Sequence, residues 1–277
     1  MEMNDINLWL ITNKPDIAKF AIENNVDRIF VDLELIGKKE RQGYLNTVIS
    51  YHTLDDVRNV RKAIPVGKLL VRCNPIHLNT NLEINQIVDM GADVIMLPMW
   101  KTLKEVETFI NSVSRRAKIC LLAETPESLS LLPELCKLDA IDEFHIGLND
   151  LHLALNKKFM FETLADGLIE KTTQCLRDNR KTFGIGGLAR IKEGLIPAEI
   201  ILGEHVRLGS SAAILSRTFH RNAKTLEDLK QEMDFQKEIS AIKTLYKSYQ
   251  KKSMMQLRKN QTVLKNFVKA IVQTSEK

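Results

Sequence analysis

The sequence lacks the features that mark several common classes of protein. It has few cysteines, and no two of them form a CxxC pair, which argues against a disulfide framework or a zinc site. No run approaches the roughly 18 consecutive apolar residues of a membrane helix. The opening residues, MEMNDINLWLITNKPD, are acidic and hold no cleavage site, so we expect no signal peptide. We expect a cytoplasmic location, in which the cysteine thiols are reduced. The cysteines are Cys73, Cys120, Cys136 and Cys175.

A strong overall charge is also missing. The formal net charge is +5, and the excess lies beyond Asn222, where basic residues outnumber acidic ones by roughly two to one. The remainder is near neutral, so we expect neither nucleic acid nor a membrane as a partner. A chain of 277 residues with 44% apolar content is long enough for one large α/β barrel or two small domains.

What is present is a repeated alternation of strand and helix. Several strand candidates, such as VIMLP and KICLLA, are continuous apolar runs, which is typical of strands buried on both faces. The pattern predicts an α/β fold, with a (β/α)8 TIM barrel as the leading architecture and a doubly wound open sheet as the alternative. No GxGxxG follows the first strand, which weakens a dinucleotide-binding interpretation. The expected strands are Ile6–Thr12, Arg28–Glu34, Lys68–Asn74, Asp93–Met99, Lys118–Glu124, Ile141–Asp150, Thr182–Leu188 and His205–Leu215. The expected helices are Lys14–Asn25, Leu54–Ile64, Leu82–Gly91, Leu103–Arg115, Ser128–Leu138, Phe161–Arg180 and Pro197–Gly203.

Two apolar runs in the middle of the chain each end in a carboxylate. KICLLAE ends at Glu124 and IDEFHIGLND ends at Asp150, with a segment of helical period between them. A strand–helix–strand unit of this length has parallel strands, so both carboxylates would emerge at the same carboxyl edge of the sheet. Acidic oxygens converging there suit a hard divalent cation, and we expect Glu124 and Asp150 to bind Mg²⁺ or Mn²⁺.

Further charged side chains are expected at the same edge. Period-two alternation puts Asp32 and Glu34 on one face of their strand, and Arg72 on the corresponding face of the next. An inward charge at a barrel rim is costly unless it is paired or binds something. The alternative is a purely structural role, in which Arg72 forms an internal ion pair with Asp32 or Glu34 that closes the barrel top. We expect a functional site, with Asp32, Glu34 and Arg72 catalytic and Arg72 also binding substrate.

The charged side chains expected at this edge of the barrel, Asp32, Glu34, Arg72, Glu124 and Asp150, suggest a reaction. A metal on Glu124 and Asp150 could chelate a 2-oxo acid, withdraw electrons from its carbonyl and stabilise the enolate formed on C–C cleavage. Arg72 would add a fixed positive donor to the developing enolate oxygen. A base is also required.

At this point the sequence resembles the HpcH/HpaI aldolase and citrate lyase β-subunit family, from about Leu8 to Phe219. The motifs that carry the resemblance are VDLE (Val31–Glu34), LVRCN (Leu70–Asn74), GADVIMLP (Gly91–Pro98), LLAETPESL (Leu121–Leu129) and IGLNDLHLAL (Ile146–Leu155). The resemblance implies a metal-dependent barrel enzyme that makes or breaks a C–C bond beside a 2-oxo acid or an acyl-CoA. By position, Glu124 and Asp150 match the family's metal ligands and Arg72 matches its enolate-stabilising arginine.

Two positions depart from the family pattern. Leu35 stands where the family's pyruvate aldolases carry a histidine and its lyases an acid, and Leu122 stands where the aldolases carry a glutamine. A longer loop brings Lys38, Lys39, Arg41 and His52 towards the rim. His52 is the candidate replacement base, unless it belongs to the turn before the next helix. Lys38 and Arg41 are candidates for binding an anionic substrate, unless they belong to a solvated loop.

Glycine-rich turns and the tail complete the expected picture. FGIGGLAR and VRLGSS are expected to follow the seventh and eighth strands, with amides of Gly186 and Gly187, and Asn149, binding substrate. We expect residues 1–221 to form the barrel. Residues 222–277 would form two basic amphipathic helices, Thr225–Gln250 and Met254–Val272, for packing or for exchange between subunits of a homo-oligomer.

The leading hypothesis is therefore a divalent-metal-dependent carbon–carbon lyase, an aldolase acting on a pyruvate-like 2-oxo acid and an aldehyde. A CoA-thioester lyase of the citrate or malyl-CoA type is the alternative on the same fold. A non-catalytic ligand-binding barrel is the alternative from another class, and Leu35 in place of a base supports it.

Overall fold

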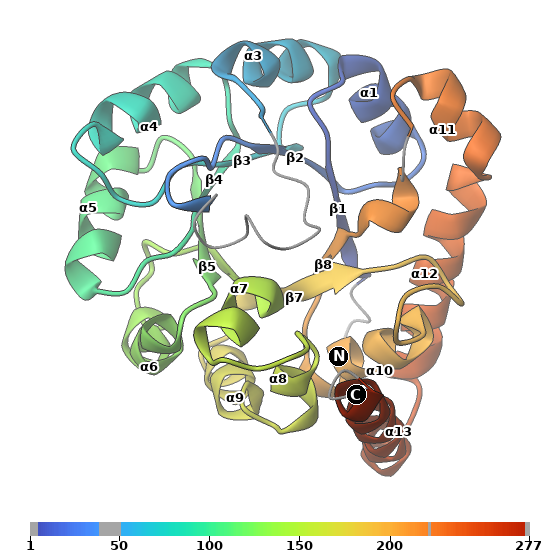
Figure 1. Ribbon diagram of the computed structural model, residues 1–277. Coiled ribbons are helices and arrows are strands. Elements are labelled where there is room, and N and C mark those ends of the chain that lie inside the picture. The colour runs from blue at the N-terminus through green and yellow to red at the C-terminus, as the bar shows by residue number, and fades with distance from the viewer. Residues whose placement is uncertain (1–4, 39–50, 221–222, 275–277) are drawn as a thin grey trace.

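The computed structural model describes residues 5–38, 51–220 and 223–274, and its centre is a closed barrel of parallel strands (Figure 1). Each strand pairs with the next along the chain, and the first pairs with the last. The predicted (β/α)8 barrel is confirmed, and closure excludes the open doubly wound sheet. The strands are β1 (Asn7–Ile11), β2 (Arg28–Asp32), β3 (Leu69–Arg72), β4 (Val94–Leu97), β5 (Lys118–Ala123), β6 (Glu143–Ile146), β7 (Thr182–Leu188) and β8 (Ala212–Leu215).

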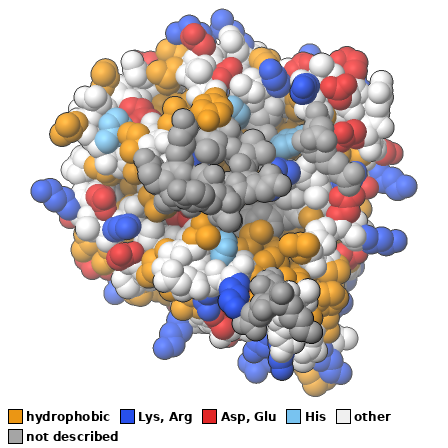
Figure 2. Space-filling model, in the orientation of Figure 1, with side chains coloured by type: hydrophobic (Ala, Val, Ile, Leu, Met, Phe, Trp, Pro, Cys, Tyr) orange, Lys and Arg blue, Asp and Glu red, His pale blue; other side chains and the backbone are white. Residues whose placement is uncertain are grey.

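Helices surround the barrel as an outer ring (Figure 1), and charged side chains of both signs cover the periphery of the molecule in the same orientation (Figure 2). Threonine capping boxes start α3 (Leu54–Ala63), α5 (Leu103–Val113), α6 (Pro126–Leu135) and α11 (Leu226–Glu232). The capping box at Thr125 fixes the start of α6 directly after Glu124. The helices that follow strands are α1 (Pro15–Glu23), α3 (Leu54–Ala63), α4 (Thr80–Asp89), α5 (Leu103–Val113), α6 (Pro126–Leu135), α7 (Leu148–Ala154), α8 (Glu162–Ala165), α9 (Glu170–Asp178), α10 (Ala198–Leu208) and the 3₁₀ turn η1 (Arg217–Phe219).

Two apolar cores explain why the strands are continuous hydrophobic runs. The larger core lies between the strands and the helices, and the smaller one fills the barrel interior. Successive strand residues contribute to the two cores in turn, so a strand buried on both faces needs no polar positions until it reaches the rim. The interior core consists of Trp9, Phe30, Leu70, Val94, Met96, Cys120, Leu122 and Ala212.

Of the elements predicted for the barrel, three differ clearly from the structure. The sixth strand ends at Ile146 rather than Asp150, because the helix α7 begins at Leu148. The stretch predicted as a strand from His205 is the end of α10, and Gly209, with φ +81°, ends that helix before β8 begins at Ala212. The predicted helix Phe161–Arg180 is divided into α8 and α9.

The C-terminal helices lie against the outside of the barrel. The predicted helix Thr225–Gln250 is divided into α11 (Leu226–Glu232) and α12 (Phe235–Gln250), and α13 (Met254–Thr274) follows. The Tyr246 hydroxyl of α12 donates to the Ser210 carbonyl, and Asn260 of α13 donates to the Ile200 carbonyl of α10. In this single chain, α13 therefore packs on its own α10. Among the helices of the described ranges, none has the length and apolarity needed to cross a lipid bilayer.

Candidate active site at the carboxyl edge of the barrel

Four charged side chains form a closed network where β2 and β3 end. Asp32 and Arg72 are register partners on parallel strands, which places their side chains beside each other at the rim. Arg72 binds Asp32 through two hydrogen bonds, Nε to Oδ1 at 2.8 Å and Nη2 to Oδ2 at 2.9 Å. Its Nη2 also lies 3.2 Å from Oε2 of Glu34. The ion pairs that were open as an alternative are therefore present.

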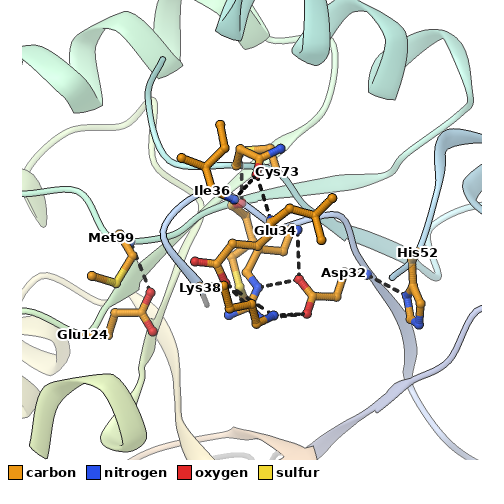
Figure 3. A network of polar contacts seen from close by, with 12 residues as sticks. Asp32, Glu34, Ile36, Lys38, His52, Cys73, Met99 and Glu124 are labelled. Carbon is orange, nitrogen blue, oxygen red and sulfur yellow. Dashed lines mark hydrogen bonds and ion pairs between the residues drawn. The ribbon is translucent and has the colours of Figure 1, made fainter. Parts of the chain in front are cut away.

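Lys38 is the fourth member of this network, although it lies outside any strand. Its Nζ is 2.6 Å from Oδ2 of Asp32 and 3.6 Å from Oε2 of Glu34 (Figure 3). Asp32, Glu34 and Lys38 are all at most 3% exposed. We call Asp32, Glu34, Lys38 and Arg72 the charged quartet. It holds two carboxylates and two cations, so its charges balance.

The charges of the quartet stabilise one another. Burial alone would raise the pKa of Asp32, but the Arg72 guanidinium and the Lys38 ammonium outweigh it and hold the pKa well below its usual range. Burial would likewise lower the pKa of Arg72, and the charges of Asp32 and Glu34 instead raise it well above its usual value. Asp32 and Arg72 are therefore both ionised throughout the physiological range.

A second group of carboxylates lies beside the quartet, at the ends of β5 and β6. Glu124 directly follows β5, and Asp150 lies in the first turn of α7. Glu124 is 3% exposed, and its Oε1 accepts the Met99 N–H at 3.1 Å. Met99 has φ +54°, a strained conformation for a residue with a side chain.

Glu124 is held close to a second negative charge. Burial and then the charge of Asp150 raise the pKa of Glu124 well above its usual value. The backbone at Gly147, between β6 and α7, comes so near that a Cβ there would lie 2.8 Å from Oε2 of Glu124. A buried carboxylate beside a like charge, in a space that only glycine leaves open, is an arrangement that a cation stabilises.

The donor set fits a hard divalent cation. Carboxylate oxygens are the ligands that Mg²⁺ prefers, and Mg²⁺ commonly takes only one or two of them from the protein and keeps water or substrate at its other positions. Within the described ranges, no group of three or more His, Cys, Asp or Glu side chains is arranged to hold a metal. Glu124 and Asp150 would therefore hold such an ion as a pair and leave positions for a ligand.

His52 does not lie beside this carboxylate pair. Its Nδ1 accepts the backbone N–H of Asp32 at 3.0 Å, and Figure 3 shows it on the opposite side of Asp32 from Glu124. Burial lowers the pKa of His52, so it is neutral at pH 7. It also directly precedes Thr53, the cap of α3, which agrees with the structural alternative for this residue.

The predicted substrate-binding residues divide into three cases. Gly186 and Gly187 lie inside β7, at an irregularity of its pairing with β8, so the expectation of a glycine-rich turn after that strand is wrong. A Cβ at Gly186 would lie 2.9 Å from Leu148, so close packing accounts for this glycine. Asn149 lies beside Asp150 in α7 and is half-buried. Arg41 lies outside the described residues.

One residue of the interior was not assigned a role from the sequence. His145 on β6 is buried, and its Nε2 donates to the Gly186 carbonyl at 3.1 Å. Its ring lies 5.1 Å from that of Trp9, and burial lowers its pKa to about 4. The alternation of EFHI, which puts His145 and Gly147 on the same face, is the signal that would have placed it inside the barrel.

The amino-acid sequence matches one protein family over more than half of its length. A sequence model of the HpcH/HpaI aldolase/citrate lyase family matches residues 5–163 of the 277. The chain belongs to that family. The match contains β1 to β6 and therefore all the residues of the quartet together with Glu124 and Asp150; β7, α10 and β8 complete the barrel beyond it. No curated protein sequence matches this HpcH/HpaI family member.

Solved structures with the same fold are distant in sequence. CitE from Mycobacterium tuberculosis in complex with magnesium and pyruvate is 12% identical, with a TM-score of 0.61, over 93% of this chain and 98% of that one. An HpcH/HpaI aldolase from Desulfitobacterium hafniense DCB-2 is 13% identical, with a TM-score of 0.57, over 77% and 86%. A family protein from Burkholderia cenocepacia J2315 is 11% identical, with a TM-score of 0.60, over 77% and 88%. At these identities the likeness shows the fold.

Proposed function

We propose that this protein is a divalent-metal-dependent carbon–carbon lyase of the aldolase type, acting on a pyruvate-like 2-oxo acid through an enolate. The observation that carries the proposal is the buried Glu124 beside Asp150 at the carboxyl edge of the barrel. Active sites of (β/α)8 enzymes are built at this edge. The CitE structure from M. tuberculosis, which contains magnesium and pyruvate, supports the choice of both ligands.

The charges of the site favour a cation at one place in particular. The quartet is balanced internally, because Asp32 and Glu34 face Arg72 and Lys38 at 2.6–3.6 Å. Glu124 and Asp150 repel each other, and the charge of Arg72 offsets only part of the effect on Glu124, whose pKa stays raised well above its usual value. Mg²⁺ or Mn²⁺ held by this pair would neutralise both carboxylates and polarise the carbonyl of a bound 2-oxo acid.

The protein's own residues then bind and orient the substrate. The Arg72 guanidinium is fixed by two hydrogen bonds to Asp32 and stays charged, so it offers a preorganised positive group to the developing enolate oxygen. The sequence predicts Asp32 and Glu34 to be catalytic, and their contacts with Arg72 support the narrower proposal that they position its guanidinium. Lys38 adds a second buried cation near the same rim, and its role in binding an anionic substrate stays a prediction.

The experiment that tests the proposal is exchange of the pyruvate methyl protons with deuterated water, followed by NMR. With Mg²⁺ or Mn²⁺ we expect exchange, because stabilising the enolate acidifies the neighbouring C–H. Glu124→Ala and Asp150→Ala should each abolish it while the circular dichroism spectrum stays that of the wild type. Full exchange in either variant would show that the metal assignment is wrong.

A second candidate function is ligand binding without turnover. Two observations favour it: Leu35, which is half-exposed, occupies the place where family aldolases carry a histidine, and Arg72 already has its hydrogen bonds to Asp32. This barrel would bind pyruvate in a metal-dependent way, measured by calorimetry, and would show no methyl exchange. If pyruvate neither binds nor exchanges, a thioester-cleavage assay with acyl-CoA substrates tests the remaining alternative on this fold.

A further inference from the structure

A pair of cysteines lies on the outside of the barrel, away from the carboxylates. Cys136 is the C-terminal cap of α6, and Cys175 lies in α9, the helix packed beside it (Figure 1). Their sulfur atoms are 3.1 Å apart, and both thiols are free. A disulfide has an S–S distance of about 2.05 Å, so the two atoms need to move closer by only about 1 Å to bond.

The two thiols differ in their access to solvent. Cys175 is partly exposed and lines a cavity of about 600 Å³ between α9, the end of α10 and the start of α13. Cys136 is 1% exposed, and burial together with its hydrogen bond to Cys175 raises its pKa to about 11. A small oxidant in solution therefore reaches Cys175 first.

The wall of the cavity beside Cys175 is rich in charged side chains. Four basic and two acidic side chains line the cavity, so its wall carries more positive than negative charge. The side-chain amide of Asn179 donates towards the Cys175 sulfur at 3.8 Å. The thiolate is the nucleophilic form of cysteine. The charged residues of the wall are Lys171, Arg177, Arg207, Arg258, Glu170 and Asp178.

We propose that Cys175 is a peroxide-reactive thiol and that Cys136 resolves it, so that oxidation joins α6 to α9 by a disulfide. This arrangement is that of a redox-sensitive cysteine: an accessible thiol with a second thiol in reach. The pair lies outside the candidate active site, so the inference holds whatever reaction the barrel catalyses.

The chemistry balances with hydrogen peroxide as the oxidant. The Cys175 thiolate attacks one peroxide oxygen, the O–O bond breaks, and protonation of the leaving hydroxide gives water and a sulfenic acid. The Cys136 sulfur then attacks the Cys175 sulfur, the S–O bond breaks, and the thiol proton leaves with the hydroxide as a second water. Two thiols lose two electrons in total, and one peroxide gains them.

The disulfide would close a loop that contains part of the site. The segment from Cys136 to Cys175 includes β6, Gly147 and α7 with Asp150. Closing a loop of this length restricts the unfolded chain, so the oxidised protein should melt at least about 5 °C higher than the reduced one.

The test uses the fully reduced full-length protein and stoichiometric hydrogen peroxide. Intact mass should fall by two hydrogen atoms, and a non-reducing peptide map should contain a Cys136–Cys175 crosslink. The melting temperature should rise and return on addition of a thiol reductant. Cys136→Ser should leave Cys175 as a sulfenic acid that dimedone traps, and Cys175→Ser should leave Cys136 reduced.

Cys73 and Cys120 serve as internal controls. Both are fully buried, and burial raises the pKa of each thiol well above its usual value. We therefore expect peroxide to oxidise them at least about tenfold more slowly than Cys175. The proposal is overturned if wild-type Cys136 and Cys175 stay reduced while peroxide oxidises Cys73 or Cys120. It is also overturned if Cys175 stops at the sulfenic acid without forming the crosslink.

Discussion

Glu124 is ionised only at an energetic cost when no cation is present. It is 3% exposed, it faces the charge of Asp150, and the Met99 N–H donates one hydrogen bond to it. A neutral amide of the same shape avoids both the burial of a charge and the repulsion. Residues that serve function are often placed at the expense of stability in this way.

We therefore predict that Glu124→Gln stabilises the metal-free protein at pH 7 by about 1–2 kcal/mol. The measurement is urea unfolding in the presence of a chelator. Addition of Mg²⁺ should then raise the stability of the wild type, through binding to the folded state only, and leave that of the variant unchanged.

Glu127→Gln is the matched control, because Glu127 is an exposed carboxylate three residues further along the same segment. Its effect should stay within about 0.5 kcal/mol with or without Mg²⁺. A Glu124→Gln variant that is less stable than the wild type in chelator would show that Glu124 has a stabilising partner and is not the strained ligand of a cation.

Single residues also show which side-chain positions can be predicted from the sequence. Asp32, Arg72 and Glu124 lie where period-two alternation puts them, because a strand's geometry determines which face each side chain occupies. Lys38 could not be placed this way. It lies six residues after the end of β2, and only the folded path of the chain between them brings its ammonium to Asp32. His52 shows the same limit, since a loop residue has no periodicity from which its direction follows.

Among the elements, β6 and α7 explain why one end of a strand was misplaced. From Phe144 to Leu148 every residue except His145 is apolar or glycine, and such residues continue a buried strand or begin a buried helix equally well. The transition occurs at Gly147, which admits the Glu124 carboxylate. Asp150 still reaches the rim, because the first turn of α7 starts there. The position of Asp150 was therefore easier to predict than the secondary structure of the segment that carries it.

Helix α13 packs on α10 through a close approach that permits a sharp test. A Cβ at Gly203 would lie 2.5 Å from Nδ2 of Asn260, the amide that donates to the Ile200 carbonyl and to Glu204. Gly203→Ala should therefore lower the free energy of unfolding by about 1–3 kcal/mol through overpacking. Denaturant unfolding measures this change.

The control is the same substitution in an Asn260→Ala background. In that background the clash is absent, and Gly203→Ala should raise the free energy of unfolding by about 0.5–1 kcal/mol because alanine is the better helix former. A sign change between the two backgrounds would establish the contact as the cause. Equal effects in both would mean that α13 does not pack on α10 of its own or a neighbouring chain at this position.

For the whole molecule, the charged quartet couples stability to pH. The pKa of Asp32 is lowered in the folded state, so its ion pairs contribute fully above the unfolded value of 3.8 and are lost as the pH falls below it. We predict that Asp32→Asn lowers the free energy of unfolding by about 3–5 kcal/mol at pH 7. The reason is that the buried positive charges of Arg72 and Lys38 then face one carboxylate fewer. The difference from the wild type should shrink by about 1.4 kcal/mol per pH unit below pH 4.

Urea unfolding of both proteins between pH 3 and 7 measures this difference. Asp55→Asn, which breaks a surface ion pair with Arg58, is the control and should change stability by less than about 0.5 kcal/mol. A difference between wild type and Asp32→Asn that stays constant down to pH 3 would contradict the assignment.

The architecture of the whole barrel was predictable because many weak signals agree. Each strand repeats the same buried pattern, and an error at one boundary, such as that of β8, does not change the number or order of units. The tail was predictable as amphipathic helices for the same reason. Its exchange between subunits stays a prediction, as does the division of the chain at residues 221 and 222, since periodicity does not specify which copy a helix contacts.

Closure of the barrel has a consequence for how the chain is made. The first strand, β1, needs β8 as a neighbour, and β8 begins at Ala212. On the ribosome, β1 to β7 emerge first, so two sheet edges with unpaired backbone groups persist through most of synthesis. Such edges invite pairing with other nascent chains. Slow translation before Ala212 would prolong this exposure, and the yield of native protein would then depend on chaperones that shield the two edges until the ring closes.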